Sequence, residues 1–484
     1  MTQPTTPRLT PVCRRLWMAG VGMLLFLCVL IAASCLAGPG RSLLGGTHGS
    51  DLIPSYMAGS FVREGQSDKL MDLAQAVRFQ ANLRQANGLE QNGRTGPWLN
   101  PPWFAALFVP LSTLSFPAAQ QVWLAFNLLL LAASIVLLCR MIMRPTNALT
   151  PQGGWRLWGL VPLLLVTSMP FIQALASQQN TFLSLFLLTL TVWLWRKANA
   201  LRAGLVAGLL LFKPQLAAVV AVVLCCSLGR RAILGLAITA IALVVSTSYS
   251  MPGALTDYLH KLPAMLPWLQ NGRPYAWERQ VTFQGFWRLL LQGRVTGPAS
   301  PTVQVLWAAC ALAVGAMLLP AIRCAVMTSS QSNDQTHAPT SRDRLIAATI
   351  AVMPLLTPYF MDYDLMLLAV PAVLFAAERA RADVPPDRAS RALVIGWAVL
   401  FPWLFINAEF GATTRVSLTV PLLALIAGLH ACRAARRVPA GPRFEAIRLA
   451  AARARRGPLF VPNISAVHAP QARPLFGKET PIVR

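Results

Sequence analysis

Long uninterrupted apolar segments are the feature that most constrains this chain. A helix needs about 20 apolar residues to cross the hydrocarbon core of a bilayer. Four segments of about that length, each without an acidic residue or a lysine, are Leu16–Ala37, Ala118–Cys139, Ala232–Ser250 and Val303–Ile322. Only 12% of all residues are charged, against about 25% in soluble domains. Because backbone groups in lipid must be paired within the chain, the sequence predicts an all-α polytopic membrane protein.

The first apolar segment has two interpretations. Arg8, Arg14 and Arg15 precede it and small residues end it, as in a secretory signal. The apolar core of a signal is about 7–15 residues long, however, which is shorter than this segment. We therefore interpret Leu16–Ala37 as a membrane anchor, and cleavage stays the alternative.

The positions of Lys and Arg predict the topology, because these residues mark cytoplasmic loops. They place residues 1–15 inside, a membrane domain at 16–432 and two long extracytoplasmic loops at about 39–117 and 253–302. The short apolar stretch after Pro101 is expected to dip into the outer leaflet and return. Ten full crossings are predicted, near residues 16–37, 118–139, 157–176, 181–195, 232–252, 303–323, 345–359, 364–378, 391–409 and 415–432.

The basic tail carries much of the net charge of +25. Residues 433–484 contain eleven Lys and Arg against two Glu. Arginines beside a span attract anionic lipid head groups. The segment shows no folded nucleic-acid-binding motif, so we interpret it as a disordered cytoplasmic tail at the membrane surface and expect no nucleic acid as partner.

Lys213-Pro214 interrupts the apolar stretch 203–228, after which Arg230 and Arg231 favour the inside. Proline breaks a helix, and a lysine is costly in lipid. We expect two half-helices that turn at this dipeptide and return, an arrangement found where broken helices line a cavity. One kinked span with both arginines outside is the alternative.

Several polar residues are predicted to lie together at the outer face. Asp51 follows the first span, and amides occur in the turn Ser177-Gln178-Gln179-Asn180. Asp51 has a purely structural alternative as a helix cap, and Lys213 as a side chain that snorkels to a head group. An acid outside and a cation at membrane depth together favour a lipid-linked phosphate substrate.

The order of these motifs resembles glycosyltransferase family 87, the polyprenol-phosphate-dependent mannosyltransferases of the membrane C superfamily. An Asp after the first span is followed by Asn100-Pro101-Pro102 and an apolar run, and then by Ala118–Asn127 with Trp123. The later motifs are Gln178-x-Asn180, Ala203-Gly204 through Gly208 to Lys213-Pro214, and Pro358–Leu365. The resemblance covers roughly residues 16–430. Ser177 stands where the family usually has Gly, and Asp362 precedes Tyr363 where it often has His.

The resemblance implies a C-superfamily-like bundle and an inverting transfer of a hexose, mannose by analogy, in a bacterial inner membrane. The donor is a polyprenyl-phosphate-linked sugar and the acceptor an envelope glycolipid or polysaccharide on the periplasmic face. Asp51 is the expected general base. The expected substrate-binding residues are Tyr56, Gln178, Asn180, Lys213, Asp362 and Tyr363. Such a donor needs no nucleotide, so we expect no metal and no cofactor, and we interpret Asp362-Tyr363-Asp364 as a helix start.

Two other classes of protein remain as alternatives. A flippase or transporter for lipid-linked sugars would also need a polar cavity at membrane depth, although it has less need of two long outer loops. A non-catalytic membrane subunit of an envelope-assembly complex would tolerate replacement of Asp51 and Lys213. We favour the glycosyltransferase, because one acid and one cation are predicted at the same face.

Overall fold

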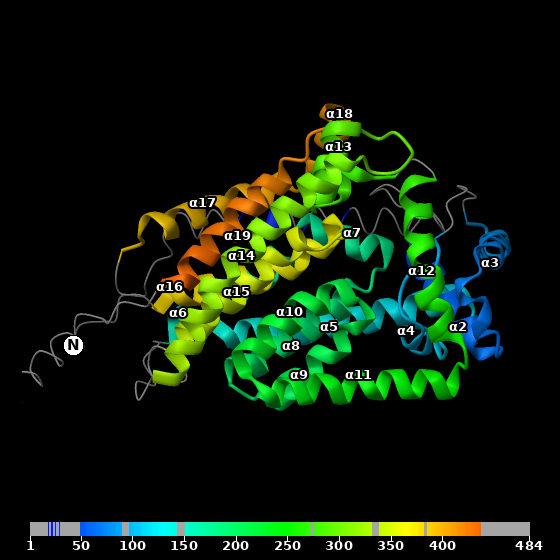
Figure 1. The fold of residues 1–484 in the computed structure, drawn as a ribbon, viewed down its shortest axis with the longest axis horizontal. Helices are drawn as coiled ribbons and strands as arrows, with labels where there is room; N and C mark the ends of the chain where they lie inside the picture. The colour runs from blue at the N-terminus through cyan, green and yellow to red at the C-terminus, as the bar shows by residue number, and fades with distance from the viewer. Residues whose placement is uncertain are drawn as a thin grey trace, which may run out of the picture. The chain divides into compact units, whose positions relative to one another are not determined.

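The structure, a computed structural model, describes residues 49–89, 96–142, 151–272, 275–331, 338–381 and 385–436, with five single residues between 18 and 29. The N-terminal segment 1–15, most of the predicted first span and the tail from residue 437 onward lie outside this part. The described residues form helices and no strands, in agreement with the predicted all-α class (Figure 1). Gln280 and Met361 form an isolated antiparallel bridge.

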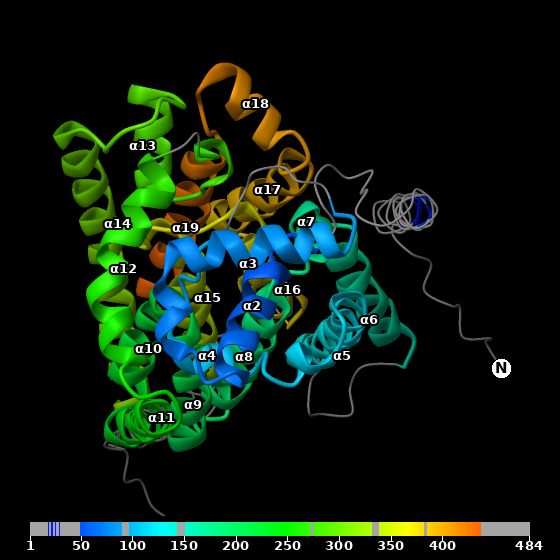
Figure 2. The same ribbon diagram turned by 90° about the vertical axis from the view of Figure 1, so that its right-hand side faces the viewer.

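Short helices follow Asp51 and precede the first long one. They are α2 (Leu52–Arg63), η1 (Ser67–Met71), α3 (Leu73–Ala86), α4 (Pro102–Ala106) and η2 (Leu111–Thr113). The stretch after Pro101 is therefore divided into two very short helices. Helix α2 packs against α3 and α4, and Figure 2 shows these helices grouped together.

The central part of the chain is formed by seven longer helices and one short 3-10 turn. They are α5 (Phe116–Ile142), α6 (Pro151–Val166), α7 (Met169–Ser177), α8 (Thr181–Arg196), α9 (Ala200–Leu209), η3 (Leu210–Phe212), α10 (Pro214–Leu228) and α11 (Arg230–Ser250). Helix α8 packs against α5 on one side and α9 on another, and α9 packs against α11.

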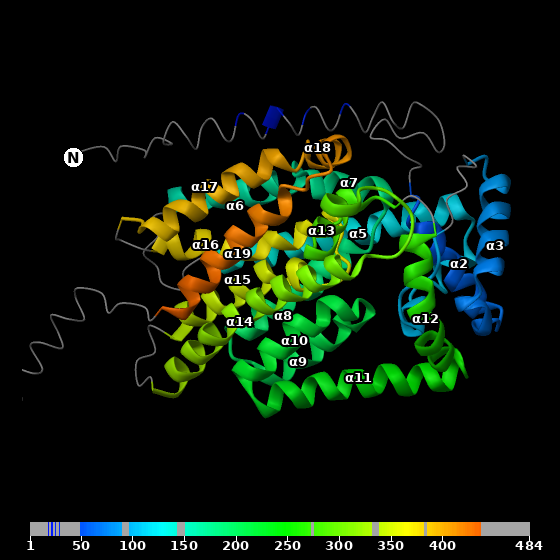
Figure 3. The same cartoon turned by 45° about the horizontal axis from the view of Figure 1, so that its top comes forward.

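The remaining elements complete the bundle. They are α12 (Ala254–Asn271), η4 (Trp277–Arg279), α13 (Phe283–Gln292), α14 (Pro301–Gln331), α15 (Ala338–Leu356), η5 (Asp362–Leu368), α16 (Ala369–Arg381), α17 (Arg388–Trp403), α18 (Asn407–Thr414) and α19 (Thr419–Ala435). Helix α15 contacts α14, α16 and α19. Figures 1 and 3 show α12 leading from the end of α11 toward the region of α13.

Three described helices are long and apolar enough to cross a membrane: α5, α11 and the Pro301–Met327 part of α14. Two bent pairs raise this number to five if each pair is one span. Four shorter apolar helices, among them α8 and α19, fall below the length of a span. The ten predicted crossings are therefore not confirmed.

The predicted span 157–176 is bent by 60° between α6 and α7. Ser168 caps α7 by accepting a hydrogen bond from the backbone N–H of Phe171 at 3.4 Å, and Pro170 lies in the first turn of that helix. A proline is tolerated there because the N–H it lacks has no partner within the helix. The predicted span 391–409 is likewise divided, because α17 and α18 meet at 78°.

The chain reverses its direction at Lys213-Pro214. Gly204 on α9 lies against the backbone of Ala232 on α11, and Gly208 lies against Thr239. The Thr239 hydroxyl donates to the carbonyl of Leu205 at 2.9 Å. Since α9 and α11 therefore run in the same direction, α10 between them must run back. This agrees with a turn at the dipeptide and disagrees with a single kinked helix. Glycines at the contact let the two backbones approach closely.

Candidate active site

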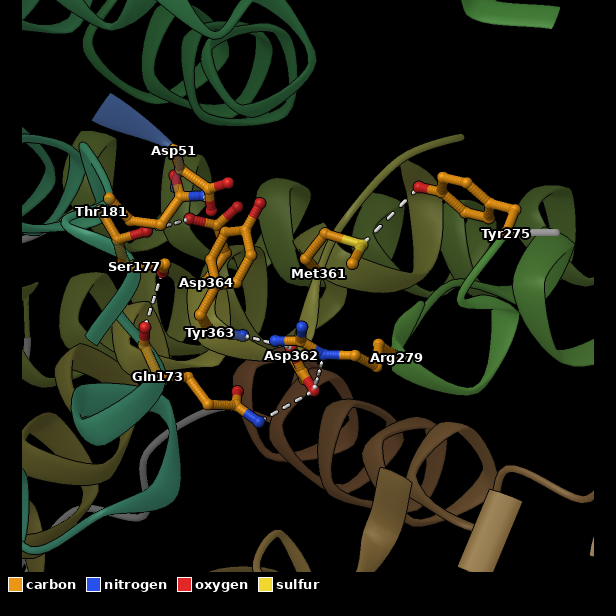
Figure 4. A network of polar contacts seen from close by, with 11 residues as sticks. Asp51, Gln173, Ser177, Thr181, Tyr275, Arg279, Met361, Asp362, Tyr363 and Asp364 are labelled. Carbon is orange, nitrogen blue, oxygen red and sulfur yellow. Dashed lines mark hydrogen bonds and ion pairs between the residues drawn. The ribbon is translucent and has the colours of Figure 1, made fainter. Parts of the chain in front are cut away.

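A cavity of about 840 Å³ lies where segments distant in sequence come together. Its walls combine polar and apolar side chains. The segments that contribute to it are 50–55, 96–100, 169–180, 213–215, 258–279 and 358–364, together with Arg84. Pockets of this size accommodate a drug-sized or sugar-sized ligand. Figure 4 shows the polar side of this region.

Asp51 occupies the N-cap position of α2 but does not cap it. Its side chain makes no capping hydrogen bond to that helix. It instead accepts hydrogen bonds from the side-chain amide of Gln179 and, at 3.4 Å, from the hydroxyl of Ser50. Its backbone N–H donates to the carbonyl of Ser177 at 3.2 Å. The carboxylate is thus held against the turn after α7 and faces the cavity.

The surroundings of Asp51 disfavour its charged form. The side chain is accessible from the cavity, whereas protein surrounds it on its other sides. This loss of hydration raises the pKa of Asp51 above its ordinary value, and the hydrogen bond from Gln179 and the charge of Arg279 offset part of the rise. A carboxylate with a raised pKa is a better proton acceptor than an ordinary aspartate.

The turn between α7 and α8 has a fixed conformation that decides which amide reaches the cavity. Gln178 adopts the left-handed region (φ 56°) at the end of α7. Its side chain is buried and does not line the cavity, whereas Gln179 and Asn180 do.

Helix α5 holds this turn in place. The indole N–H of Trp123 donates to the carbonyl of Gln178 at 3.0 Å, and the amide of Asn127 donates to the carbonyl of Gln179 at 3.4 Å. Trp123 and Asn127 are four residues apart and therefore lie on one face of α5. Their spacing in the sequence thus has a structural explanation.

Lys213 lies in the cavity wall but is already paired. Its ammonium group contacts Oδ1 of Asp364 at 2.8 Å. The hydroxyl of Thr181 donates to the same carboxylate oxygen at 2.7 Å. The cation beside the helix break is therefore bound to an acid from the segment after α15.

Arg279 forms a second ion pair with the same short segment. Its Nε and Nη2 donate to Asp362 at 3.0 and 2.9 Å. Asp362 also accepts hydrogen bonds from the amide of Gln173 at 3.2 Å and from the backbone of Tyr363 at 2.9 Å. Arg279 and Tyr363 line the cavity, whereas Asp362 lies behind the wall.

Four tyrosines also line the cavity: Tyr258, Tyr275, Tyr359 and Tyr363. The phenol of Tyr275 accepts a hydrogen bond from Gln280 at 3.1 Å. Burial raises the pKa of Tyr275 above its ordinary value. Its phenol is therefore neutral at physiological pH and is suited to hydrogen bonds with hydroxyl groups.

The structure thus brings four of the seven predicted site residues to one cavity: Asp51, Asn180, Lys213 and Tyr363. The other three, Tyr56, Gln178 and Asp362, do not line it. The hydroxyl of Tyr56 donates to the carbonyl of Leu114 at 2.7 Å, and its ring packs against Phe116. The roles predicted for all seven stay predictions.

Sequence reasoning missed Gln179, Arg279, Tyr275 and Tyr359. Gln179 stands in the predicted turn, but nothing in the sequence shows which of two adjacent glutamines points inward. Arg279 and Tyr275 lie in the long loop 253–302, where no periodicity fixes the position of a side chain. In the described part of the chain, no group of three His, Cys, Asp or Glu side chains is arranged to hold a metal ion.

Comparison with known proteins identifies the family. Residues 98–358, more than half of the chain, match the sequence model of glycosyltransferase family 87. The chain belongs to this family and is a membrane glycosyltransferase. No curated protein and no solved structure matches the chain. Asp51 precedes the matched region and Asp362 and Tyr363 follow it, whereas Gln178, Asn180 and Lys213 lie within it.

Proposed function

We propose that the protein transfers a hexose, mannose by analogy with its family, from a polyprenyl-phosphate-linked donor to an envelope glycolipid or polysaccharide. The observation that carries the proposal is that a carboxylate, Asp51, lines the same cavity as three cations, Arg84, Lys213 and Arg279. A transferase that uses a lipid phosphate needs a base for the acceptor and positive charge for the leaving phosphate. One cavity here offers both.

In the proposed reaction, a hydroxyl of the acceptor attacks the anomeric carbon of the donor sugar. The new glycosidic bond forms as the bond between that carbon and the phosphate oxygen breaks, and the configuration inverts. Asp51 accepts the hydroxyl proton, and polyprenyl phosphate leaves with the electron pair. The raised pKa of Asp51 fits this role, because proton acceptors work best when their pKa approaches the working pH.

Neutral hydrogen-bonding groups surround the place where the sugar would lie. The amides of Gln179 and Asn180 and the phenols of Tyr359 and Tyr363 line the same wall. Hydroxyl groups of a sugar can both donate to and accept from such side chains. In this proposal Tyr56, Gln178 and Asp362 shape the wall, and the reaction requires neither a metal nor a cofactor.

The proposed membrane is the bacterial inner membrane, with the cavity on the periplasmic side. The distribution of Lys and Arg supports this orientation, because it places both long loops outside. The residues of those loops, such as Asp51, Asn100 and Arg279, meet at one cavity. This is expected if the two loops lie on the same side of the membrane.

Transfer by the purified protein in lipid nanodiscs tests the proposal. The protein receives a radiolabelled polyprenyl-phosphate hexose and a lipid extract from cells that lack it, and mass spectrometry identifies the product. Incorporation from this donor, and none from a nucleotide-linked hexose, is expected. Incorporation from the nucleotide sugar would contradict the proposed donor. Movement of the donor across liposome membranes without transfer would favour a flippase.

A further inference from the structure

Three cations line the cavity, Arg84, Lys213 and Arg279, and they differ in their access to a ligand. Arg84 is buried. The other two are paired with acids of one short segment, Lys213 with Asp364 and Arg279 with Asp362. The side chain of Lys213 is 9% exposed, whereas that of Arg279 is 35% exposed. Arg279 is therefore the cation of the cavity that is most accessible to a ligand.

The guanidinium group of Arg279 is held in place, but not all of its nitrogens have a hydrogen-bond partner. Two of its nitrogens, Nε and Nη2, are held by Asp362. Its third nitrogen, Nη1, has no hydrogen-bond partner among the residues that the structure describes. Asp362 itself accepts hydrogen bonds from Gln173 and from the backbone of Tyr363 (Figure 4). The Nε and Nη2 side of the guanidinium group is therefore fixed, whereas Nη1 can still donate to a ligand.

Lys213 has a different setting. Its ammonium group and the hydroxyl of Thr181 share one carboxylate oxygen of Asp364. Thr181 begins α8, Lys213 precedes α10, and Asp364 belongs to η5. The ion pair and the hydroxyl of Thr181 thus join three elements at the wall of the cavity. Breaking such a buried pair is costly, because it leaves an unpaired charge.

The charge of Arg279 also interacts electrostatically with Asp51. The positive charge lowers the pKa of Asp51, yet no hydrogen bond joins the two side chains. An inverting displacement needs the base and the phosphate-binding cation on opposite sides of the anomeric carbon, because the acceptor and the leaving group lie in line. Arg279 and Asp51 line the same cavity without a hydrogen bond between them, which is compatible with a substrate carbon lying between the two groups.

We propose that Arg279 is the residue that contacts the donor phosphate, that Asp362 positions it, and that the Lys213–Asp364 pair maintains the cavity wall. This inference rests on the proposed polyprenyl-phosphate donor. The phosphate changes from one negative charge in the donor toward two in the leaving group, so a fixed cation stabilises the transition state more than the ground state. The planar fork of an arginine suits phosphate oxygens better than an ammonium group does.

Binding of a short polyprenyl phosphate to the full-length protein in nanodiscs tests the inference without turnover. The matching polyprenol, which lacks the phosphate, measures binding of the chain alone. Arg279→Gln is expected to weaken binding of the phosphate about 10- to 100-fold, the range for a hydrogen bond to a charged group. It should leave polyprenol binding unchanged. Arg78→Gln, at an exposed position on α3 that does not line the cavity, is the matched control and should bind like the wild type.

Two further variants keep the inference falsifiable. Arg279→Lys retains the charge without the fork and should bind a few-fold more weakly than the wild type, even if the glutamine variant fails to fold. Lys213→Gln should lower the midpoint of thermal unfolding more than the affinity for the phosphate. Normal phosphate binding by Arg279→Gln, with a loss in Lys213→Gln, would overturn the inference and leave the proposed donor in place. Absence of any binding by the wild type would instead reject the donor.

Discussion

The two ends of helix α8 carry ion pairs of different kinds. At its start, Thr181 and Lys213 contact Asp364 beside the cavity. At its other end, Arg196 pairs with Asp343 through bonds of 2.7 and 2.9 Å. The helix has 16 residues, so about 24 Å separates the two groups.

The Arg196 end carries two neighbouring groups of ion pairs that are closed off from the cavity. Arg344 and Arg433 both contact Glu378, at 2.6 and 2.9 Å. A further nitrogen of Arg196 donates to the backbone carbonyl of Met141 at 3.2 Å. None of these residues lines the cavity. Three arginines here share two acids, Asp343 and Glu378, and these contacts join the ends of α8, α15, α16 and α19.

The cavity end uses the same side-chain chemistry in an open arrangement. Arg279 leaves one nitrogen available, and Asp51 faces the cavity with amide and hydroxyl partners rather than a cation. Ion pairs alone therefore do not mark a functional site. A functional site is indicated where charged groups have hydrogen-bonding atoms that face a cavity and have no partner in the protein.

The largest expected effect is a loss of activity from a substitution at the cavity end of α8. Asp51→Asn keeps the size of the side chain and removes the proton acceptor. Sugar transfer should fall about 10²- to 10⁴-fold, the usual contribution of a general base. Initial rates in nanodiscs measure this. The control is Asp68→Asn, an exposed position on η1, which should retain the wild-type rate. Equal rates for the two variants would remove Asp51 from the mechanism.

The next effect concerns stability at the closed end. Glu378→Gln leaves two arginines without their counter-ion and should lower the free energy of unfolding by about 3 kcal/mol. The KM for the donor should not change. Denaturation in detergent gives the stability, and Glu409→Gln, exposed on α18, is the control. An unchanged stability would mean that the network does not hold the helix ends.

A smaller effect is expected where α5 supports the turn at the cavity. Trp123→Phe removes the indole donor to Gln178 and part of a buried ring. A loss of about 2 kcal/mol is expected from the hydrogen bond and the packing together. Thermal unfolding with and without bound polyprenyl phosphate measures it. If the variant is as stable as the wild type, the turn is held by other contacts.

The smallest effect is a shift in pH dependence. Asp51 acts as a base only when it is deprotonated, so the rate should fall as the pH drops through its raised pKa. The hydrogen bond from Gln179 favours the charged form. Gln179→Met removes that bond and should move the acid limb of the pH–rate profile to higher pH. If the acid limb of the profile does not move, a group other than Asp51 determines the fall in rate at low pH.

Part of this arrangement was predictable from the sequence. The break at Lys213-Pro214 and the polar turn after Ser177 are marked by residues that helices in lipid do not tolerate. The cavity location of Asn180 and Lys213 follows from that logic, whereas Asp51 was expected from its position after the first span and Tyr363 from the family resemblance. The bend at Ser168 was missed, because a capping serine in an apolar run looks like any small residue.

The other features of the site depend on side-chain directions and backbone conformations that cannot be read from the sequence. Tyr56 was expected near Asp51, but five positions along a helix rotate a side chain by about 140°. The left-handed backbone of Gln178 turns its side chain away and exposes Gln179. Asp362 was expected to line the sugar site, but Arg279 from a loop without periodicity covers it.

An experimental structure of the protein with bound polyprenyl phosphate tests the central claim most directly. The account predicts that the phosphate lies in the 840 Å³ cavity, within hydrogen-bond distance of Nη1 of Arg279 and on the same side of the bundle as Asp51. A phosphate found at the other end of α8, against Arg196, Arg344 and Arg433, would contradict it.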